Sequence, residues 1–370
     1  MFRKSLLAGF AGLLLSTSAT LADDNHNVNF TANGAETSSS ANDHAPIGVM
    51  GDHMHNKGEF MLSYRYSRMD MDGNRIGTNS VSPETIATTI PNRFFGVAGQ
   101  PPTLRVVPTE MSMDMHMFGA MYAPTDWLTL MAMGMWMDKG MDHITFQGGA
   151  GTTVLGTFST ESKGWGDTKL GGLFKLYDEN GQKLHLNASL SVPTGSIKET
   201  DTVLAPNGMT PTLRLPYGMQ LGTGTYDFHP GITYNGFQDQ WSWGAQYSAE
   251  IRLENENDQG YSWGDKHSIS AWGSYEWEQW ISTSLRINAW TQDDIDGIDP
   301  NIVAPVQTAD PDNYGGEVVE AAFGINLIGT SGTLTDHRLG FEISTPIYQD
   351  LNGPQMERDW AVTIGWQKAF

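Results

Sequence analysis

The sequence predicts an all-β protein, a transmembrane antiparallel β-barrel of about twelve strands. Three observations support this fold class. Apolar and polar residues alternate with a period of two in segment after segment, and the chain ends in such a segment, finishing on the aromatic residue Phe370. No window of the mature chain approaches the ~20 consecutive apolar residues that a membrane helix needs. A closed barrel satisfies every backbone hydrogen bond within lipid without helices.

The last segment, residues 357–370, shows the alternation clearly. Its even positions carry Trp360, Val362, Ile364 and Trp366, and its odd positions carry small or polar residues. A bulky apolar face with Trp near its ends is typical of a strand that contacts lipid on one side and a wet lumen on the other. A core strand of a soluble sandwich is the alternative interpretation.

The chain divides into three parts. Residues 1–22 combine a basic start, an apolar run at 6–15 and small residues before Ala22, which predicts a secretory signal peptide. Residues 23–58 are polar and lack a sustained period, so we expect a flexible or plug-like N-terminal segment that contains His and Met residues. Residues 59–370 carry the alternation and form the predicted barrel.

Composition excludes several classes of protein. Cysteine is absent, which excludes disulfides and thiolate metal sites. The formal net charge is -21 at pH 7, and nucleic-acid binding needs clustered Lys and Arg instead. The mean hydropathy of -0.35 argues against a helical membrane protein but suits a barrel, because only every second strand residue meets lipid.

Strand-like segments follow one another to the end of the chain, joined alternately by short and long connections. They cover residues 60–67, 111–122, 127–137, 163–177, 182–192, 223–234, 240–253, 266–277, 280–290, 316–328, 337–348 and 357–370. Short links such as 123–126 contain turn-forming residues, and the long links are rich in Gly, Pro, Asp and Thr. The alternation predicts short periplasmic turns, long outer loops and both termini on the periplasmic side.

Ionisable residues on the polar faces are predicted to line the lumen, because a charge at a lipid-facing mid-strand position costs ~2 to 4 kcal/mol for Arg or Lys. The predicted lumen residues are Arg65, Asp114, His116, Asp167, Lys169, Lys175, His185, Asp227, His229, Glu250, Arg252, Glu276, Arg286, Glu320, Arg338 and Glu342. They form either a mutually paired network that rigidifies the barrel or the lining of a selective conduit. The alternating strand methionines at 111–117 and 131–137 are predicted to face lipid.

A second hypothesis concerns metal. Thioether and imidazole groups suit copper, so Met50, His53, Met54 and His55 are the candidate ligands in a copper-binding alternative, against a segment without metal. No other cofactor is expected. The sequence contains no GxSxG, HExxH or phosphate-binding loop, so we do not predict an enzyme.

Several blocks resemble a known family. Residues 164–176 (GWGDTKLGGLFKL), 190–196 (LSVPTGS), 221–234 (LGTGTYDFHPGITY) and 241–248 (WSWGAQYS) are similar to the outer-membrane transporter family labelled MetA-pathway of phenol degradation, a relative of long-chain fatty-acid transporter-type barrels. The resemblance implies a location in the bacterial outer membrane and passive uptake of small, hydrophobic or aromatic solutes. The terminal segment resembles the signal through which the barrel-assembly machinery recognises such chains. Lipid and a small solute are thus the other expected partners, and a closed structural barrel is a further alternative.

Overall fold

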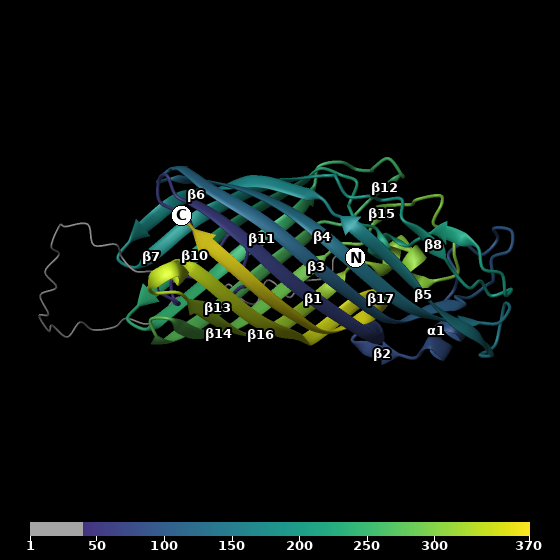
Figure 1. The fold of residues 1–370 in the computed structure, drawn as a ribbon. Helices are drawn as coiled ribbons and strands as arrows, with labels where there is room; N and C mark the ends of the chain where they lie inside the picture. Colours follow the sequence, from purple (N-terminus) through teal and green to yellow (C-terminus); the bar gives the residue numbers. More distant parts are fainter. Residues whose placement is uncertain (1–39) are drawn as a thin grey trace, which may run out of the picture. The chain divides into compact units, whose positions relative to one another are not determined.

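A computed structural model describes residues 40–370, so the predicted signal peptide and residues 23–39 lie outside the described residues. One antiparallel sheet closes on itself where β1 pairs with β17 (Figure 1). Phe60 and Phe370 exchange backbone hydrogen bonds of 3.2 and 2.7 Å at this seam. Among the described residues, no helix is long and apolar enough to cross a bilayer.

Neighbouring strands of the wall follow chain order, and every pair is antiparallel. They are β1 (Phe60–Gly77), β3 (Val106–Thr125), β4 (Leu128–Phe146), β5 (Val154–Trp165), β6 (Thr168–Glu179), β7 (Gln182–Val192), β10 (Asp227–Gln238), β11 (Trp241–Arg252), β13 (Lys266–Glu278), β14 (Ile281–Gln292), β16 (Gly316–Ile328) and β17 (His337–Ala369). The alternating sequence thus forms the predicted transmembrane antiparallel barrel.

β17 supplies two adjacent strands of the wall. Its first half pairs with β16 and its second half with β1. The halves contact each other, since Arg338 donates to Gln367 Oε1 at 2.6 Å and Thr345 donates to the Asp359 carbonyl at 2.9 Å. The chain reverses near Gly353, whose φ of 62° favours glycine.

β5 and β6 occupy one position, because each pairs with a different part of β4. The predicted single strand at 163–177 is therefore wrong in detail. The chain breaks at Gly166 and Asp167, and the Asp167 carboxylate accepts hydrogen bonds from two loop amides, those of Gly195 and Thr223. With β17 counted as two strands, and with β5 and β6 counted as one, the described wall has twelve strand positions. This confirms the predicted architecture.

The two ends of the barrel differ. One end, the short-turn end, carries tight turns such as that between β6 and β7, where Asn180 and Gly181 have φ of 54° and 71°. The other, the long-loop end, carries β2 (Asn79–Val81), α1 (Pro83–Thr89), β8 (Thr200–Thr202), β9 (Thr212–Arg214), β12 (Tyr261–Ser262) and β15 (Asp296–Gly297). Of the 3-10 helices within residues 40–370, this end also carries η2 (Tyr217–Met219), η3 (Gln307–Ala309) and η4 (Pro311–Asn313), whereas η5 (Gly332–Leu334) lies at the short-turn end.

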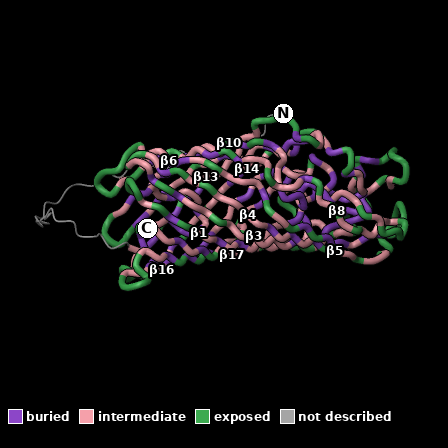
Figure 2. Tube along the Cα trace, turned by 45° about the horizontal axis from the view of Figure 1, so that its top comes forward, coloured by how far each residue is buried: buried purple, intermediate pink, exposed green. Residues whose placement is uncertain are grey.

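The outer face of the wall is apolar. Phe118, Leu170 and Leu285 are 48, 49 and 69% exposed at mid-strand positions, whereas their chain neighbours turn inward. Figure 2 shows the most exposed stretches in the turns and loops, with exposed and buried classes interleaved along the strands. Exposed Trp127, just before β4, and exposed Trp241, the first residue of β11, lie at the short-turn end, as in the aromatic girdle of a membrane barrel.

Candidate functional site

Residues 40–58 lie inside the barrel, and we call them the plug. Ala41 donates to the carbonyl of Gln279 at 2.9 Å, in the turn between β13 and β14. Gly58 donates to the carbonyl of Ala123 at 2.8 Å, beside the turn between β3 and β4. The plug therefore enters and leaves at the short-turn end. Residues 23–39, the first part of the predicted flexible or plug-like segment, lie outside the described residues.

Polar side chains of the wall bind the backbone of the plug. The donors and the carbonyls that accept from them are Arg338 with Ala45 (2.5 Å), Arg65 with Val49 (3.3 Å), Gln246 with Met50 (2.9 Å), His185 with Gly51 (2.9 Å) and Asn235 with Asp52 (2.8 Å). They come from five different strands of the wall. Each such hydrogen bond contributes about 0.5–1.5 kcal/mol net, so the plug is held from several sides.

Apolar contacts fix the plug as well. Ala45 and Val49 pack with Trp272 of β13 in one buried cluster. Ile47 lies against two wall glycines, Gly340 and Gly365, where an added Cβ would come within 2.8 and 2.7 Å of its side chain. Because any larger residue would clash there, these glycines make room for the plug.

Of the sixteen predicted lumen residues, thirteen lie on the inward faces of strands, and Asp167 lies in the break between β5 and β6. Arg65, His185 and Arg338 bind the plug, and Glu276 accepts a hydrogen bond from Ser40. The others pair mainly among themselves or with loops: Arg286–Glu342 (2.5 Å), Asp227–Arg252 (2.6 Å), Glu250–Arg252 (3.4 Å), Glu320–Arg358 (3.4 Å), Lys169–His229 (3.3 Å), Lys175–Asp178 (3.0 Å) and Asp167–Thr223 (2.8 Å). The ionisable residues that β6 to β17 contribute to the lumen therefore form a paired network.

Asp114 and His116 lie on the outer face, so their assignment to the lumen is wrong. They share the face of β3 with exposed Phe118. His116 Nδ1 hydrogen-bonds to the Tyr64 hydroxyl at 2.8 Å, and Asp114 pairs with Arg68 at 3.3 Å. These polar groups satisfy one another outside the barrel, in the manner of residues at a membrane interface.

The methionines of β3 and β4 face inward, not toward lipid as predicted. Met111 and Met141 are buried with Leu215, Met219 and Met356 in one cluster. A second cluster joins Met61, Met121 and Leu173, with Met54 of the plug and Met131 against it. A cavity of about 40 Å³ separates the plug from Met117, Met121, Met131 and Met133. We call the inward methionines of β3 and β4, together with the residues of these two clusters, the methionine surface, and it forms an apolar part of the lumen.

A larger cavity of about 490 Å³, the outer pocket, lies at the long-loop end. Its lining is largely apolar and combines strand ends with loops: Val106, Phe158, Leu204, Leu213, Leu215 and Ile302. His143 stacks on Phe158 with ring centroids 4.6 Å apart. Leu215 belongs both to this lining and to the methionine cluster around Met111, so the outer pocket and the methionine surface are contiguous.

Two buried cations hold loops at the long-loop end of the barrel. Arg105 is fully buried and donates to carbonyls of residues 147, 148, 150 and 151, next to the pocket-lining Gly148 and Gly149. Lys139 of β4 donates to the carbonyls of Gly218 and Gln220 at 2.9 and 2.6 Å. Lys139 thereby holds η2 over the methionine surface. Neither cation was singled out from the sequence, because only the fold brings these carbonyls to them.

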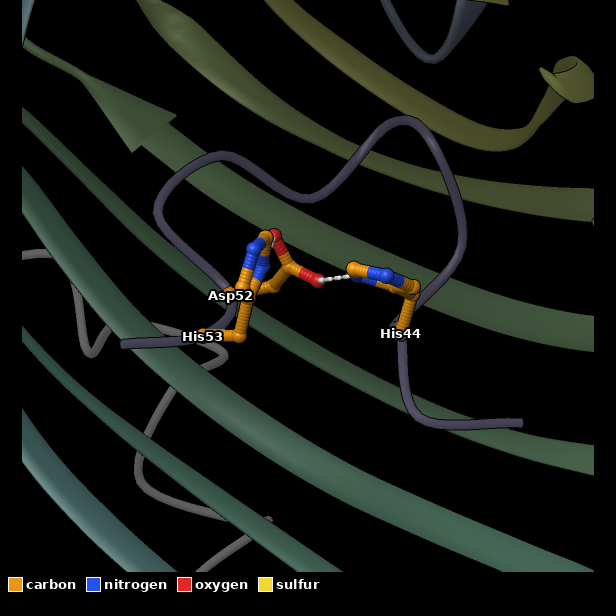
Figure 3. Close-up of side chains that lie close together, drawn as sticks. All are labelled: His44, Asp52 and His53. Atoms are coloured by element: carbon orange, nitrogen blue, oxygen red, sulfur yellow. Dashed lines mark hydrogen bonds and ion pairs between the residues drawn. The ribbon is translucent and has the colours of Figure 1, made fainter. Parts of the chain in front are cut away.

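The four predicted copper ligands do not form a Met and His set. The Met50 sulfur contacts the Arg65 guanidinium, and Met54 packs against the cluster around Met61. His53 Nδ1 lies 2.9 Å from Asp52 Oδ1, and His55 Nδ1 lies 3.4 Å from Glu59 Oε2. The structure instead brings His53 together with Asp52 and His44 (Figure 3). The sequence reasoning missed these two, although both stand in the same His-rich stretch.

The closed wall, its apolar outer face and its filled lumen define the class as a transmembrane β-barrel. No protein-family model and no curated protein sequence matches the chain significantly. The fold is similar to a crystal structure of an outer membrane channel from Pseudomonas putida F1, with a TM-score of 0.55, 13% identity and coverage of 86% of this chain and 98% of that one. The likeness confirms the fold that the sequence resemblance implied.

Two other solved structures have lower TM-scores. A FadL homologue of Pseudomonas aeruginosa gives 0.43 at 10% identity, covering 90% of this chain and 98% of the other. The toluene transporter TodX of P. putida gives 0.38 at 12% identity, covering 86% and 91%.

Proposed function

We propose that the protein is a bacterial outer-membrane channel for the passive passage of a small hydrophobic or aromatic solute. The observation that carries the proposal is the contact between the outer pocket and the methionine surface through Leu215. This contact places apolar side chains between the outer pocket and the methionine surface, along the direction in which an apolar solute would pass. The proposal includes no catalytic step.

The dimensions and chemistry of the route suit such a solute. The outer pocket lies within the roughly 300–1,000 Å³ range of small-molecule sites. Methionine side chains are flexible and polarizable, so they adapt to apolar molecules of different shapes. The charged residues across the lumen pair with one another, which leaves the methionine surface as the face that a hydrophobic solute can contact.

The location and orientation follow from the same class of protein. In outer-membrane barrels the short turns face the periplasm and the long loops face outward. The outer pocket then faces the medium and the plug faces the periplasm. The channel from P. putida F1, described as an outer membrane protein, supports this location. Lipid contacts the wall, and we expect the C-terminal half of β17 to contact the assembly machinery.

Two alternatives receive less support. A closed structural barrel explains the plug and the paired charges, but it gives no reason for an apolar cavity of about 490 Å³ in the loops. The copper-binding alternative is not supported, because the Met50 sulfur contacts a guanidinium and Met54 packs in an apolar cluster.

Uptake by whole cells tests the proposal, because their lipopolysaccharide leaflet resists apolar solutes. We expect cells that produce the protein to take up radiolabelled benzene faster than cells that lack it. Ala304→Trp fills the outer pocket and should reduce this gain about tenfold, the effect of ~1.4 kcal/mol. Leu285→Trp places the same indole on the lipid face, where Leu285 is 69% exposed, and should leave benzene uptake unchanged. Equal uptake with and without the protein would refute the proposal.

A further inference from the structure

Three side chains of the plug converge in the lumen: His44, Asp52 and His53. In Figure 3 the Asp52 carboxylate lies between the two imidazole rings. One ligand atom from each residue lies within 4.8 Å of the others. Asp52 Oδ2 is 3.9 Å from His44 Nδ1, and Asp52 Oδ1 is 2.9 Å from His53 Nδ1. Two nitrogen donors and one carboxylate therefore face a common point.

Several imidazole nitrogens in and beside this cluster make no hydrogen bond. His44 Nδ1, His53 Nε2 and His55 Nε2 are buried and make no hydrogen bond within the part of the chain that the structure describes. An unsatisfied buried polar atom costs roughly 1–3 kcal/mol, and three in one cluster call for an explanation. The rings stand in a row, with centroid separations of 4.5 Å between His44 and His53 and 4.9 Å between His53 and His55.

Surrounding groups hold the ligands in place. Asp52 Oδ2 accepts from the Ala45 amide at 3.1 Å, and the Asp52 carbonyl accepts from Asn235 at 2.8 Å. Such outer contacts orient metal ligands in proteins.

We propose that His44, Asp52 and His53 bind a divalent transition-metal ion of the zinc class inside the barrel. Two imidazoles and one carboxylate are ligands that zinc accepts, and water can complete the coordination. The cations Arg65 and Arg338 contact the neighbouring plug carbonyls, so we expect weaker affinity than at a site with four protein ligands. This site differs from the sulfur-containing copper set that the sequence suggested.

Such an ion would act on the plug. His44 and His53 stand at the two ends of a loop of the plug, and the loop between them supplies the Ala45, Val49, Met50 and Gly51 carbonyls that bind the wall. A metal bond across the ends would restrict this loop before it docks and so reduce the entropy lost on docking. The ion would thus stabilise the closed state of the lumen.

Zinc titration of the full-length protein, purified in detergent and stripped with a chelator, tests the proposal by calorimetry. We expect one Zn²⁺ per chain, and at least about tenfold weaker binding in His44→Gln and in His53→Gln separately. His229→Gln removes a lumen histidine that contacts Lys169 instead, and should bind as the wild type does.

Cobalt provides a second measurement, because its visible absorption reports nitrogen and oxygen ligation directly. We expect the wild-type and His229→Gln proteins to give the same spectrum, and both cluster variants to lose it. Each variant is first shown to be folded by its shifted mobility on unheated gels. Zinc binding that is equally strong in the two cluster variants, or no stoichiometric binding in the wild type, would overturn the proposal.

Discussion

Arg338 joins the plug to the wall. Its guanidinium is 2% exposed and donates to Asn326 of β16, Gln367 of β17 and the Ala45 carbonyl. A buried cation is tolerated only when hydrogen-bonded, so these acceptors and Arg338 depend on each other. The closed plug therefore rests partly on one side chain.

Replacing this residue should open the plug. Arg338→Gln removes the contact with Ala45 and leaves its carbonyl without that donor, at a cost of roughly 1–3 kcal/mol. We expect more frequent open events in planar bilayers. Arg75→Gln, which removes an ion pair with Glu357 in the wall instead, should conduct as the wild type does. An unchanged record for Arg338→Gln would show that the plug does not depend on it.

Three packed tyrosines in the loops should make the long-loop end sensitive to alkali. Burial raises the pKa of Tyr217 to about 12, and it raises the pKa values of Tyr261 and Tyr314 as well. The folded loops thus hold these protons more tightly than the unfolded chain, whose tyrosines titrate near 10. Loop stability is complete below pH 10 and is lost as the pH rises toward 12.

Absorbance of tyrosinate, followed together with proteolysis of the loops, measures this effect. We expect the loops to become cleavable in the same pH range in which the late tyrosines ionise. Tyr217→Phe should remove one of the late-titrating groups. Ionisation of every tyrosine near pH 10 with the loops still intact would contradict the prediction.

At the scale of elements, η2 restricts the route between the outer pocket and the methionine surface. Lys139 of β4 holds η2 by two carbonyls, and the Ser162 hydroxyl donates to the Met219 carbonyl at 2.6 Å. Lys139→Met keeps the length of the side chain but removes both donors. We expect looser loops and about threefold faster uptake of benzene.

The matched control for this variant is Lys163→Met on the neighbouring β5. Lys163 is 57% exposed and lies 3.5 Å from Asp138, an exposed pair that contributes little. Uptake should not change in this control. Slower uptake in Lys139→Met would mean that η2 lines the route without restricting it.

The sequence predicted the elements better than their faces. Period-two alternation separates two faces of β3, but the face with Met113 is more apolar than the face with Asp114, so it was assigned to lipid. The barrel reverses this, because its lumen is apolar on that side and because Tyr64, Tyr66 and Arg68 pair with the polar groups outside. Hydropathy alone cannot distinguish an apolar face toward lipid from an apolar face toward an apolar lumen, because it does not show what fills the lumen.

The plug contacts and the outer pocket could not be predicted either, because both depend on residues far apart in the sequence. Residues 23–58 were expected to be flexible or plug-like. The contacts of residues 40–58 with the wall are long-range, so no local pattern predicts them. The outer pocket depends on loops that are far apart in the sequence, such as those with Leu204 and Ile302. Inward ionisable residues could be predicted in thirteen cases because their strands have one clearly apolar face.

On the scale of the whole molecule, the seam between β1 and β17 closes the wall. Phe370 is 63% exposed, and its ring lies 6.3 Å from that of Phe60. Phe370→Ala should lower the amount of folded protein in the outer membrane severalfold, because the terminal aromatic residue is the expected contact of the assembly machinery. Phe323→Ala removes a comparable lipid-facing ring within β16.

Both variants lose similar apolar area to lipid, so their stabilities toward urea after refolding in detergent should be alike, within about 1 kcal/mol. Only assembly in cells should separate them, as measured by the fraction that migrates as folded barrel on unheated gels. If Phe323→Ala assembles as poorly as Phe370→Ala, the terminal residue has no special part in recognition.

Both ends of the plug meet the barrel at the same rim, at Gln279 and at Ala123. A force on the N-terminal end of the plug can therefore withdraw it through this rim. Withdrawal threads no chain through the barrel and breaks no hydrogen bond between strands. Force spectroscopy that pulls on residue 40 should therefore record release of the plug as a small early rupture, well separated from the unfolding of the barrel.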